Sequence, residues 1–194
     1  MKKINEIFYS LQGEGYYSGH PAVFIRFSGC NLKCPFCDTQ HNDGKKMTDE
    51  EIVEEVKKYP TRLVVITGGE PSLYLDEEFI KKLRLAGINT VAVETNGTHR
   101  LPRNVDYITC SPKFEYCDNA EVVLSRIDEI KVVWNMKNDM EKYKSLKATR
   151  RYLQPCDVQD EKKNKEIQES AVMYCLQNPE WNLSLQTQKI LGVR

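Results

Sequence analysis

Three cysteines within eight residues form the strongest chemical signal in the sequence. Cys30, Cys34 and Cys37 follow a C-x3-C-x2-C spacing, so three thiolates on one short loop could converge on one metal centre. Iron–sulfur clusters normally have four cysteine ligands. Three ligands would leave one iron open to a small molecule. A zinc site is the competing interpretation, because His41 follows Cys37 by four residues and could complete a tetrahedral Cys3His set.

A second motif, Gly68-Gly69-Glu70-Pro71, follows the apolar run at residues 63–67. Glycines let a backbone approach a ligand closely, and a carbonyl at a strand end can accept a hydrogen bond from an ammonium group. The same motif would also suit a simple turn between a strand and a helix.

Charged residues also stand in or beside apolar runs. Arg26 shares one face of a predicted strand with Ala22 and Phe24. Its buried guanidinium needs an anionic partner, and a substrate carboxylate suits its planar fork. An internal salt bridge is the alternative. Glu94 ends another apolar run and is expected to face the same site, although a local pair would explain it too.

The elements that position these residues alternate between strands and helices. Predicted strands span residues 22–27, 63–67, 89–95, 105–110, 128–134, 152–155 and 181–186, and predicted helices span 48–59, 76–85 and 161–175. Thr48 and Glu51 have the spacing of a capping box at the start of the first helix. Near-continuous Val/Ile runs between helices predict an α/β fold with parallel strands buried on both faces. A closed barrel typically needs about 250 residues. The chain has 194, so we expect a single domain, 1–194, with a partial, reduced (β/α) barrel.

Composition excludes several classes of protein. Lys+Arg and Asp+Glu are each 28, so no basic excess exists to bind a nucleic-acid backbone. No apolar run approaches the roughly 20 residues of a membrane helix, and the N-terminus lacks the apolar core of a signal peptide. We therefore expect a cytoplasmic protein that binds neither nucleic acid nor membrane. In a reducing compartment, its seven cysteines favour metal binding or catalysis over disulfides.

The cysteine loop after the first barrel strand, the aromatic Phe36 and the later GGEP together resemble the radical SAM superfamily. The resemblance implies a [4Fe-4S] cluster on Cys30, Cys34 and Cys37. The open iron would be chelated by the amino and carboxylate groups of S-adenosyl-L-methionine (SAM). An electron from the cluster would then cleave SAM to a 5′-deoxyadenosyl radical.

Further segments resemble the 7-carboxy-7-deazaguanine synthase family within that superfamily. They are FYSLQGEG at residues 8–15, Cys37-Asp38-Thr39, TGGEP, VETNGT, SPK, QP and the tail LSLQTQKILGVR. The family converts 6-carboxy-5,6,7,8-tetrahydropterin to 7-carboxy-7-deazaguanine plus ammonia in queuosine and deazapurine biosynthesis. The resemblance implies a carbon–nitrogen lyase, a homodimer, Mg²⁺ and an electron donor such as flavodoxin or ferredoxin.

The resemblance also implies roles for individual residues. It assigns the substrate to Leu11, Gln12, Gly13, Glu14, Arg26, Thr67 and the terminal carboxylate of Arg194. It assigns SAM to Phe36, Cys37, Asp38, Gly69, Ser111, Pro112, Lys113, Gln154, Pro155, Cys156 and Asp157, and Mg²⁺ to Thr39. Glu14, Arg26 and Glu94 are the candidate catalytic residues. Gln12 and Glu14, between glycines, could bind the amide-like edge of a pterin, although alone they would indicate a polar loop.

Gln188 departs from the family, which commonly has histidine in the motif QTHK; glutamine can hydrogen-bond but cannot titrate. From sequence alone the tail around it would be disordered. Two alternative functions stay open. A radical SAM activase could generate a glycyl radical on a partner protein, although Arg26 and the LQGEG segment argue against it. A non-catalytic zinc-binding module would explain the cysteines but leave GGEP and Arg26 unexplained.

Overall fold

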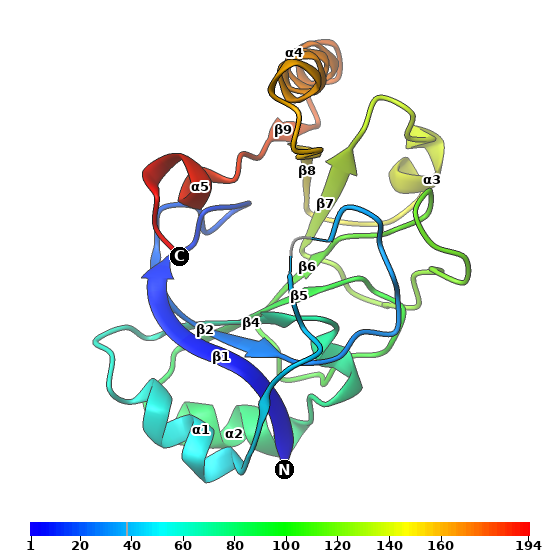
Figure 1. Ribbon diagram of the computed structural model, residues 1–194. Coiled ribbons are helices and arrows are strands. Elements are labelled where there is room, and N and C mark those ends of the chain that lie inside the picture. The colour runs from blue at the N-terminus through cyan, green and yellow to red at the C-terminus, as the bar shows by residue number, and fades with distance from the viewer. Residues whose placement is uncertain (38) are drawn as a thin grey trace.

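The computed structural model describes residues 1–37 and 39–194, and these residues form one nine-stranded sheet in the order β3-β1-β2-β4-β5-β6-β7-β8-β9 (Figure 1). The strands are β1 Lys2–Leu11, β2 Pro21–Phe27, β3 Lys45–Met47, β4 Leu63–Gly68, β5 Thr90–Thr95, β6 Tyr107–Cys110, β7 Glu129–Trp134, β8 Arg150–Pro155 and β9 Asn182–Leu183. From β2 through β9 every neighbouring pair is parallel, whereas β1 is antiparallel to both β2 and β3.

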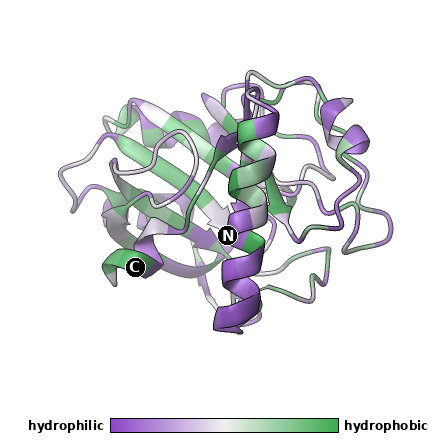
Figure 2. Cartoon of the chain, turned by 90° about the horizontal axis from the view of Figure 1, so that it is seen from above, coloured by the Kyte–Doolittle hydropathy of each residue, from purple (hydrophilic) through white to green (hydrophobic). Residues whose placement is uncertain are grey.

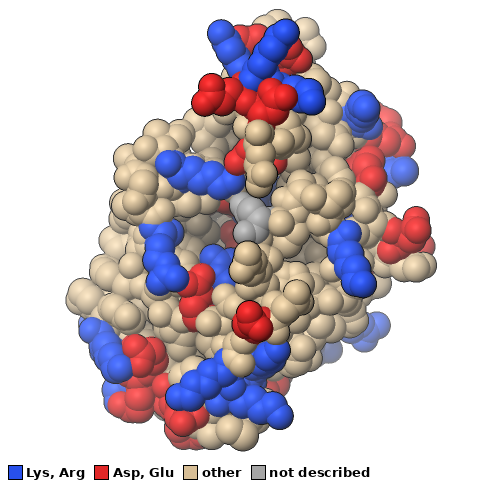
Figure 3. All heavy atoms as spheres, viewed as in Figure 1, with Lys and Arg blue, Asp and Glu red and all other residues tan. Residues whose placement is uncertain are grey.

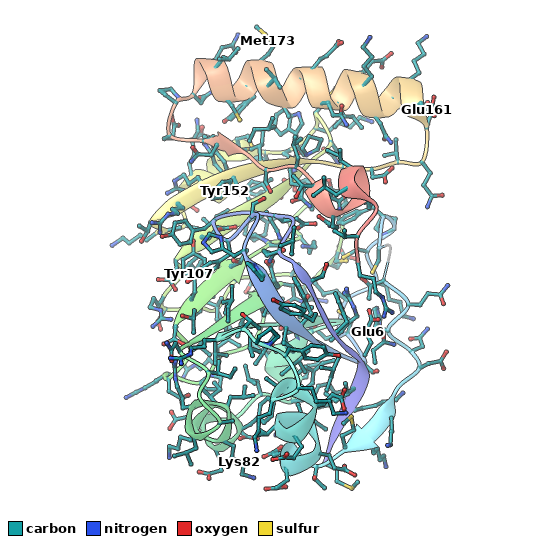
Figure 4. All side chains as sticks on the ribbon, turned by 90° about the vertical axis from the view of Figure 1, so that its left-hand side faces the viewer. Glu6, Lys82, Tyr107, Tyr152, Glu161 and Met173 are labelled. Carbon is teal, nitrogen blue, oxygen red and sulfur yellow. The ribbon has the colours of Figure 1, made fainter. Side chains whose placement is uncertain are left out.

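Helices follow β3, β4, β7, β8 and β9 along the chain. They are α1 Asp49–Val56, α2 Glu77–Leu85, α3 Met140–Lys144, α4 Glu161–Gln177 and α5 Thr187–Leu191, with a 3-10 turn, η1, at Pro71–Leu73. Figure 4 shows α4, labelled at Glu161 and Met173, across the top of the molecule and Lys82 of α2 at the bottom. No helix formed by the described part of the chain is long and apolar enough to cross a bilayer.

Local sequence explains where the first helices begin and end. Thr48 accepts a hydrogen bond from the Glu51 backbone at 3.2 Å, and the Glu51 carboxylate accepts one from the Thr48 backbone at 2.7 Å. This reciprocal pair is the predicted capping box of α1. The helix ends at Val56, three residues before the predicted end. Gly87, with φ of 93°, follows α2 and adopts the left-handed backbone that favours glycine.

The strands are buried on both faces. In β2, the side chains of Val23, Ile25 and Phe27 pack outward beneath the helices, in a core with Ile52, Ile66 and Phe79 among its members. The alternate residues Ala22 and Phe24 face inward, in a smaller cluster with Phe8, Val65, Ala92 and Tyr107. Figure 2 shows hydrophobic residues concentrated in the strands. Arg26 continues the inward-facing series, so its side chain enters the interior of the partial barrel.

The predicted α/β class and partial barrel are confirmed, and each predicted strand and helix has a counterpart. Four elements were not predicted: β1, β3, α3 and α5. The final predicted strand shrinks to Asn182–Leu183, and the tail expected to be disordered forms α5. β1 was not predicted because its sequence, KKINEIFYSL, mixes charged and apolar residues instead of forming an apolar run.

Candidate functional site

A cavity of about 750 Å³ opens inside the partial barrel and is lined from β1, β2, β4, β5, β7, β8 and the loops that follow them. Parallel strands end at the same edge of a sheet, and loops there commonly form binding sites. In Figure 3, basic and acidic side chains are interspersed over the face in view, in keeping with the zero formal net charge.

The cysteine loop forms one wall of this cavity. Cys30, Cys34 and Cys37 all line it and all are free thiols. The Gly29 backbone donates to the His41 carbonyl at 2.8 Å, and the Cys37 backbone donates to the Cys34 carbonyl at 3.2 Å. Burial raises the pKa of the Cys34 thiol to about 12. Metal binding must deprotonate such thiols. Among the described residues, no three His, Cys, Asp or Glu side chains already stand in a metal-binding arrangement.

The GGEP turn lies directly against the cysteine loop. A Cβ atom on Gly69 would stand 2.0 Å from the Gly29 carbonyl oxygen, and one on Gly68 would stand 2.2 Å from the Phe27 carbonyl oxygen. Gly68 also has φ of 137°. The backbone of Glu70 donates to the Gly29 carbonyl at 2.8 Å. Two glycines are therefore needed because this turn approaches the backbone that carries the cysteines.

Glu70 turns inward and is fully buried. Its carboxylate accepts hydrogen bonds from the Thr95 hydroxyl and the Asn96 backbone, each at 2.7 Å, and from the Ser72 backbone at 3.0 Å. It therefore ties the turn after β4 to the end of β5. The sequence motif predicted a role for the backbone of this turn but none for the Glu70 side chain.

A buried charge network lies on the opposite side of the cavity. Lys131, on β7, donates to Glu14 at 2.6 Å and to Glu94 at 2.8 Å. Burial alone would raise the pKa of Glu14, but Lys131 outweighs it and holds that pKa at about 2. Burial likewise disfavours charge on Lys131, but Glu14 and Glu94 raise its pKa above the usual range. Gln12 donates to Glu94 at 3.2 Å, so the two predicted acids share one network.

The C-terminal tail closes over this network. Gln186 and Gln188 donate to the second oxygen of Glu14 at 3.2 and 2.9 Å. The Thr187 hydroxyl donates to the Gly13 carbonyl at 2.8 Å. A Cβ atom on Gly13 would stand 1.8 Å from Gln188 Oε1, so the glycine is what allows the tail to come this close. These contacts explain why the tail is ordered.

Arg26 lies at the end of the cavity formed by β1 and β2. Its Nε donates to Glu6 at 2.8 Å, and Arg194 pairs with the other oxygen of the same carboxylate. In residues 1–37 and 39–194, the terminal nitrogens of Arg26 have no hydrogen-bond partner. The internal salt bridge, which was the alternative interpretation of Arg26, therefore exists, yet the planar fork of Arg26 can still bind an anion.

A flat apolar wall separates the two charged regions. Phe8 and Phe24 stack with ring centroids 4.9 Å apart and an interplanar angle of 6°, and both rings line the cavity with Val65. The guanidinium groups of Arg26 and Arg194 lie 5.7 and 5.2 Å from the Phe8 ring centroid. Such a wall suits one face of a planar heterocycle.

The structure brings most predicted site residues to this cavity. Those that line it are Leu11, Gln12, Gly13, Glu14, Arg26, Cys30, Cys34, Phe36, Cys37, Thr39, Thr67, Gly69, Glu94, Ser111, Lys113, Gln154, Pro155, Cys156, Asp157 and Arg194. Pro112 does not line it, and Asp38 lies outside the described residues.

Sequence reasoning missed Lys131, Glu6 and Gln186. Lys131 could have been found, since it is a lysine within the apolar strand EIKVVW and the argument used for Arg26 applies to it equally.

Known proteins resemble the chain at the level of both sequence and structure. The Radical SAM superfamily model matches residues 24–111. A 7-carboxy-7-deazaguanine synthase of Bacteroides thetaiotaomicron is 52% identical over 194 residues, covering 100% of both chains. One of Caulobacter vibrioides is 43% identical and covers 98% of each. The crystal structure of QueE from Escherichia coli superposes with a TM-score of 0.78 at 29% identity, covering 95% of this chain and 93% of that one.

Proposed function

The chain belongs to the 7-carboxy-7-deazaguanine synthase family, and we propose that it converts 6-carboxy-5,6,7,8-tetrahydropterin to 7-carboxy-7-deazaguanine plus ammonia. It is a radical SAM enzyme of queuosine and deazapurine biosynthesis. The family match leaves the glycyl-radical activase and the zinc-binding module without support.

The observation that carries the proposal is the distribution of charge along the cavity. At one end, Lys131 with Glu14 and Glu94 gives an excess of one carboxylate. At the other end, the Glu6 carboxylate pairs with the side chains of both Arg26 and Arg194, and the terminal nitrogens of Arg26 stay available to an anion. A carboxylated pterin matches this pattern. Its N–H edge would face the carboxylates, its own carboxylate would face Arg26, and its ring would lie on the Phe8–Phe24 wall.

The cysteine wall fits a [4Fe-4S] cluster with one open iron. Three thiols share one short loop, and GGEP brings further backbone against that loop. The cluster, when bound, supplies the electron that cleaves SAM and so generates the radical. Phe36, Gly69, Lys113 and Gln154 line the same cavity and would hold SAM.

The protein side chains position the substrate and hold its charge. Glu14 stays ionised at neutral pH because its pKa is about 2, so it accepts hydrogen bonds from the pterin edge. Arg26 fixes the distance between the substrate carboxylate and the Glu14 end of the cavity. Gln186 and Gln188 cover the Glu14 end of the cavity, and Arg194 lies at the Arg26 end. Substrate and product plus ammonia contain the same atoms, so the conversion needs no net oxidant, and SAM is regenerated.

Several features remain predictions from the family. Thr39 would contribute its hydroxyl to Mg²⁺, and because one hydroxyl is a weak ligand, substrate and water would complete the sphere. We also expect a homodimer, a single domain over residues 1–194, a flavodoxin or ferredoxin as electron donor, and a cytoplasmic location. The continuous sheet supports the single domain.

Anaerobic reconstitution with iron and sulfide tests the function directly. We expect a brown protein that forms 7-carboxy-7-deazaguanine from SAM, reductant and 6-carboxy-5,6,7,8-tetrahydropterin. Cys37→Ala should lose colour and activity, whereas Cys175→Ala, on α4, should lose neither. A brown protein that cleaves SAM without forming product would refute the substrate, and a colourless protein with bound zinc would refute the family assignment.

Arg26→Ala tests substrate recognition separately. A charged hydrogen bond contributes about 1.5–3 kcal/mol, so we expect KM for the pterin to rise roughly 10- to 100-fold. The dissociation constant of SAM should change little. Arg103→Ala, an exposed residue that does not line the cavity, is the control. Equal weakening of SAM and pterin binding would contradict the assigned role of Arg26.

A further inference from the structure

A fourth cysteine contacts the cysteine wall from a distant part of the sequence. The sulfur of Cys117, in the loop after β6, lies 3.7 Å from the sulfur of Cys34. At this distance the two thiols form an S–H···S hydrogen bond in which either atom could be the donor. Cys117 belongs to no C-x2-C pair, and neither the motifs nor the mechanism gives it a role.

Independent contacts hold Cys117 in place. Its backbone donates to the Lys113 carbonyl at 3.1 Å, which closes a turn in the loop. The neighbouring Tyr116 donates its hydroxyl to the Val133 carbonyl at 3.1 Å. The Tyr116 ring packs edge-on against Phe36, with centroids 4.5 Å apart. The ring contact thus packs the two loops against each other beside the sulfur pair, so the approach of the loops does not depend on the sulfurs alone.

Binding of iron would decide the direction of this hydrogen bond. A cysteine ligates iron as a thiolate, which has no hydrogen to donate. Once Cys34 is a ligand it can only accept, and Cys117 becomes the donor. Hydrogen bonds to the sulfurs of a cluster stabilise the more negative, reduced state and so raise its reduction potential.

We propose that the Cys117 thiol donates a hydrogen bond to the Cys34 thiolate in the loaded enzyme and raises the reduction potential of the cluster. Cys117 is therefore a positioning and tuning residue and does not bind iron itself. This inference rests on the proposed cluster site. It extends that proposal because Cys34 alone of the three ligands would accept a hydrogen bond from Cys117, a residue outside the cysteine motif.

The test is the midpoint potential of the cluster in the reconstituted full chain, measured by an EPR-monitored redox titration without SAM. Cys117→Ala and Cys117→Val remove the donor, and valine also fills the space that a water could occupy. We expect both to shift the midpoint potential to more negative values. Cys117→Ser keeps an O–H donor and should stay near the wild-type potential. Cys175→Ala is the control for loss of a cysteine elsewhere and should leave the potential unchanged.

Each failure has a distinct signature. Midpoint potentials that match wild type in both Cys117→Ala and Cys117→Val would overturn the inference while leaving the proposed function intact. If Cys117→Ala changed the SAM-free EPR line shape, and SAM then abolished the difference, Cys117 would be a ligand of the open iron, which also overturns the inference. A wild-type chain that takes up no cluster would overturn the proposed function and this inference together.

Discussion

Lys131 balances two carboxylates in a region from which water is largely excluded. Its side chain is 7% exposed, and those of Glu14 and Glu94 are 15% and 19% exposed. Buried ion pairs add little to stability relative to apolar residues, but removal of one partner leaves an uncompensated charge. The role of Lys131 is thus to keep both carboxylates ionised and fixed where substrate can reach them.

Replacement of Lys131 by methionine should destabilise the fold by about 3–5 kcal/mol, because two carboxylates would then face each other without a cation. Urea denaturation measures this loss. Lys57→Met, which removes an exposed ion pair with Glu54, should have little effect. Adding Glu14→Gln to Lys131→Met should recover part of the loss. A Lys131→Met chain as stable as wild type would contradict the network described above.

The low pKa of Glu14 also predicts the behaviour of the protein in acid. The pKa falls from 4.5 to about 2 on folding, so the folded state binds the proton less tightly than the unfolded state. The contribution to stability is therefore complete above pH 4.5 and is lost as the pH falls toward 2. Urea denaturation at several pH values should show a shallower acid decline in Glu14→Gln. An unchanged slope would mean that other carboxyls dominate.

At the scale of elements, the turn after β4 needs glycine because the neighbouring backbone leaves no room for a Cβ atom, as well as for conformational reasons. The absence of side chains at Gly68 and Gly69 permits contact with the backbone of the cysteine loop, and Glu70 binds the turn to the end of β5. The carboxyl ends of β2, β4 and β5 are thereby held together. The position of the cysteines is thus set by a turn some thirty residues further along the chain.

Gly69→Ala should therefore impair cluster binding, because a Cβ atom would overlap the Gly29 carbonyl. We expect a reduced iron content after reconstitution, measured by metal analysis, and a lower Tm. Gly87→Ala, remote from the cavity, should lower Tm through its φ of 93° but leave the iron content at the wild-type level. Full iron loading of Gly69→Ala would show that the loop can move aside.

Much of this arrangement could be predicted from sequence because the signals are local. The apolar runs at residues 22–27 and 63–67 predicted their strands, and the capping residues predicted the start of α1. β1 and the tail could not be predicted in the same way. β1 depends on its pairing with β2 and β3, and α5 depends on contacts with Gly13 and Glu14. These stabilising contacts are far apart in the sequence, so no local pattern reveals them.

The residues of the candidate site likewise divide into those with a local sequence signal and those that depend on distant contacts. The cysteines, Arg26 and Glu94 were recognised because each stands out from its immediate neighbours. Glu6 was not recognised, because a glutamate is common in a strand of mixed charged and apolar residues. Only the structure shows that it pairs with Arg26 and Arg194. The contact between Cys34 and Cys117 joins residues 83 positions apart and has no sequence signature at all.

At the scale of the whole molecule, the sheet is open in the part of the chain that the structure describes. Its edge strands are β3 and β9, which do not pair with each other. The tail bridges this gap, since Thr187, Gln188 and Arg194 reach Gly13, Glu14 and Glu6 on the other side. Figure 1 shows α5 and the C-terminus beside the end of β1.

Removal of residues 187–194 should consequently weaken pterin binding more than cluster binding, because the removed side chains pair with Gly13, Glu14, Glu6 and Asp157, none of which is a predicted cluster ligand. We expect normal iron content and a KM for the pterin raised at least tenfold, on the scale of one lost charged contact. Thr187→Ala with Gln188→Ala tests the same contacts in a chain of full length. Loss of iron from the truncated chain would contradict this division of roles.

The position of Arg194 has a practical consequence for handling the protein. Arg194 lies in the wall of the cavity beside the end of β1, whereas Met1 is 82% exposed and lies where β1 begins (Figure 1). Residues fused after Arg194, such as an affinity tag, would start from the wall of the cavity beside Glu6 and Arg26. Residues fused before Met1 would project into solvent. Purification by an N-terminal tag should therefore preserve turnover, and the same tag at the other end should not.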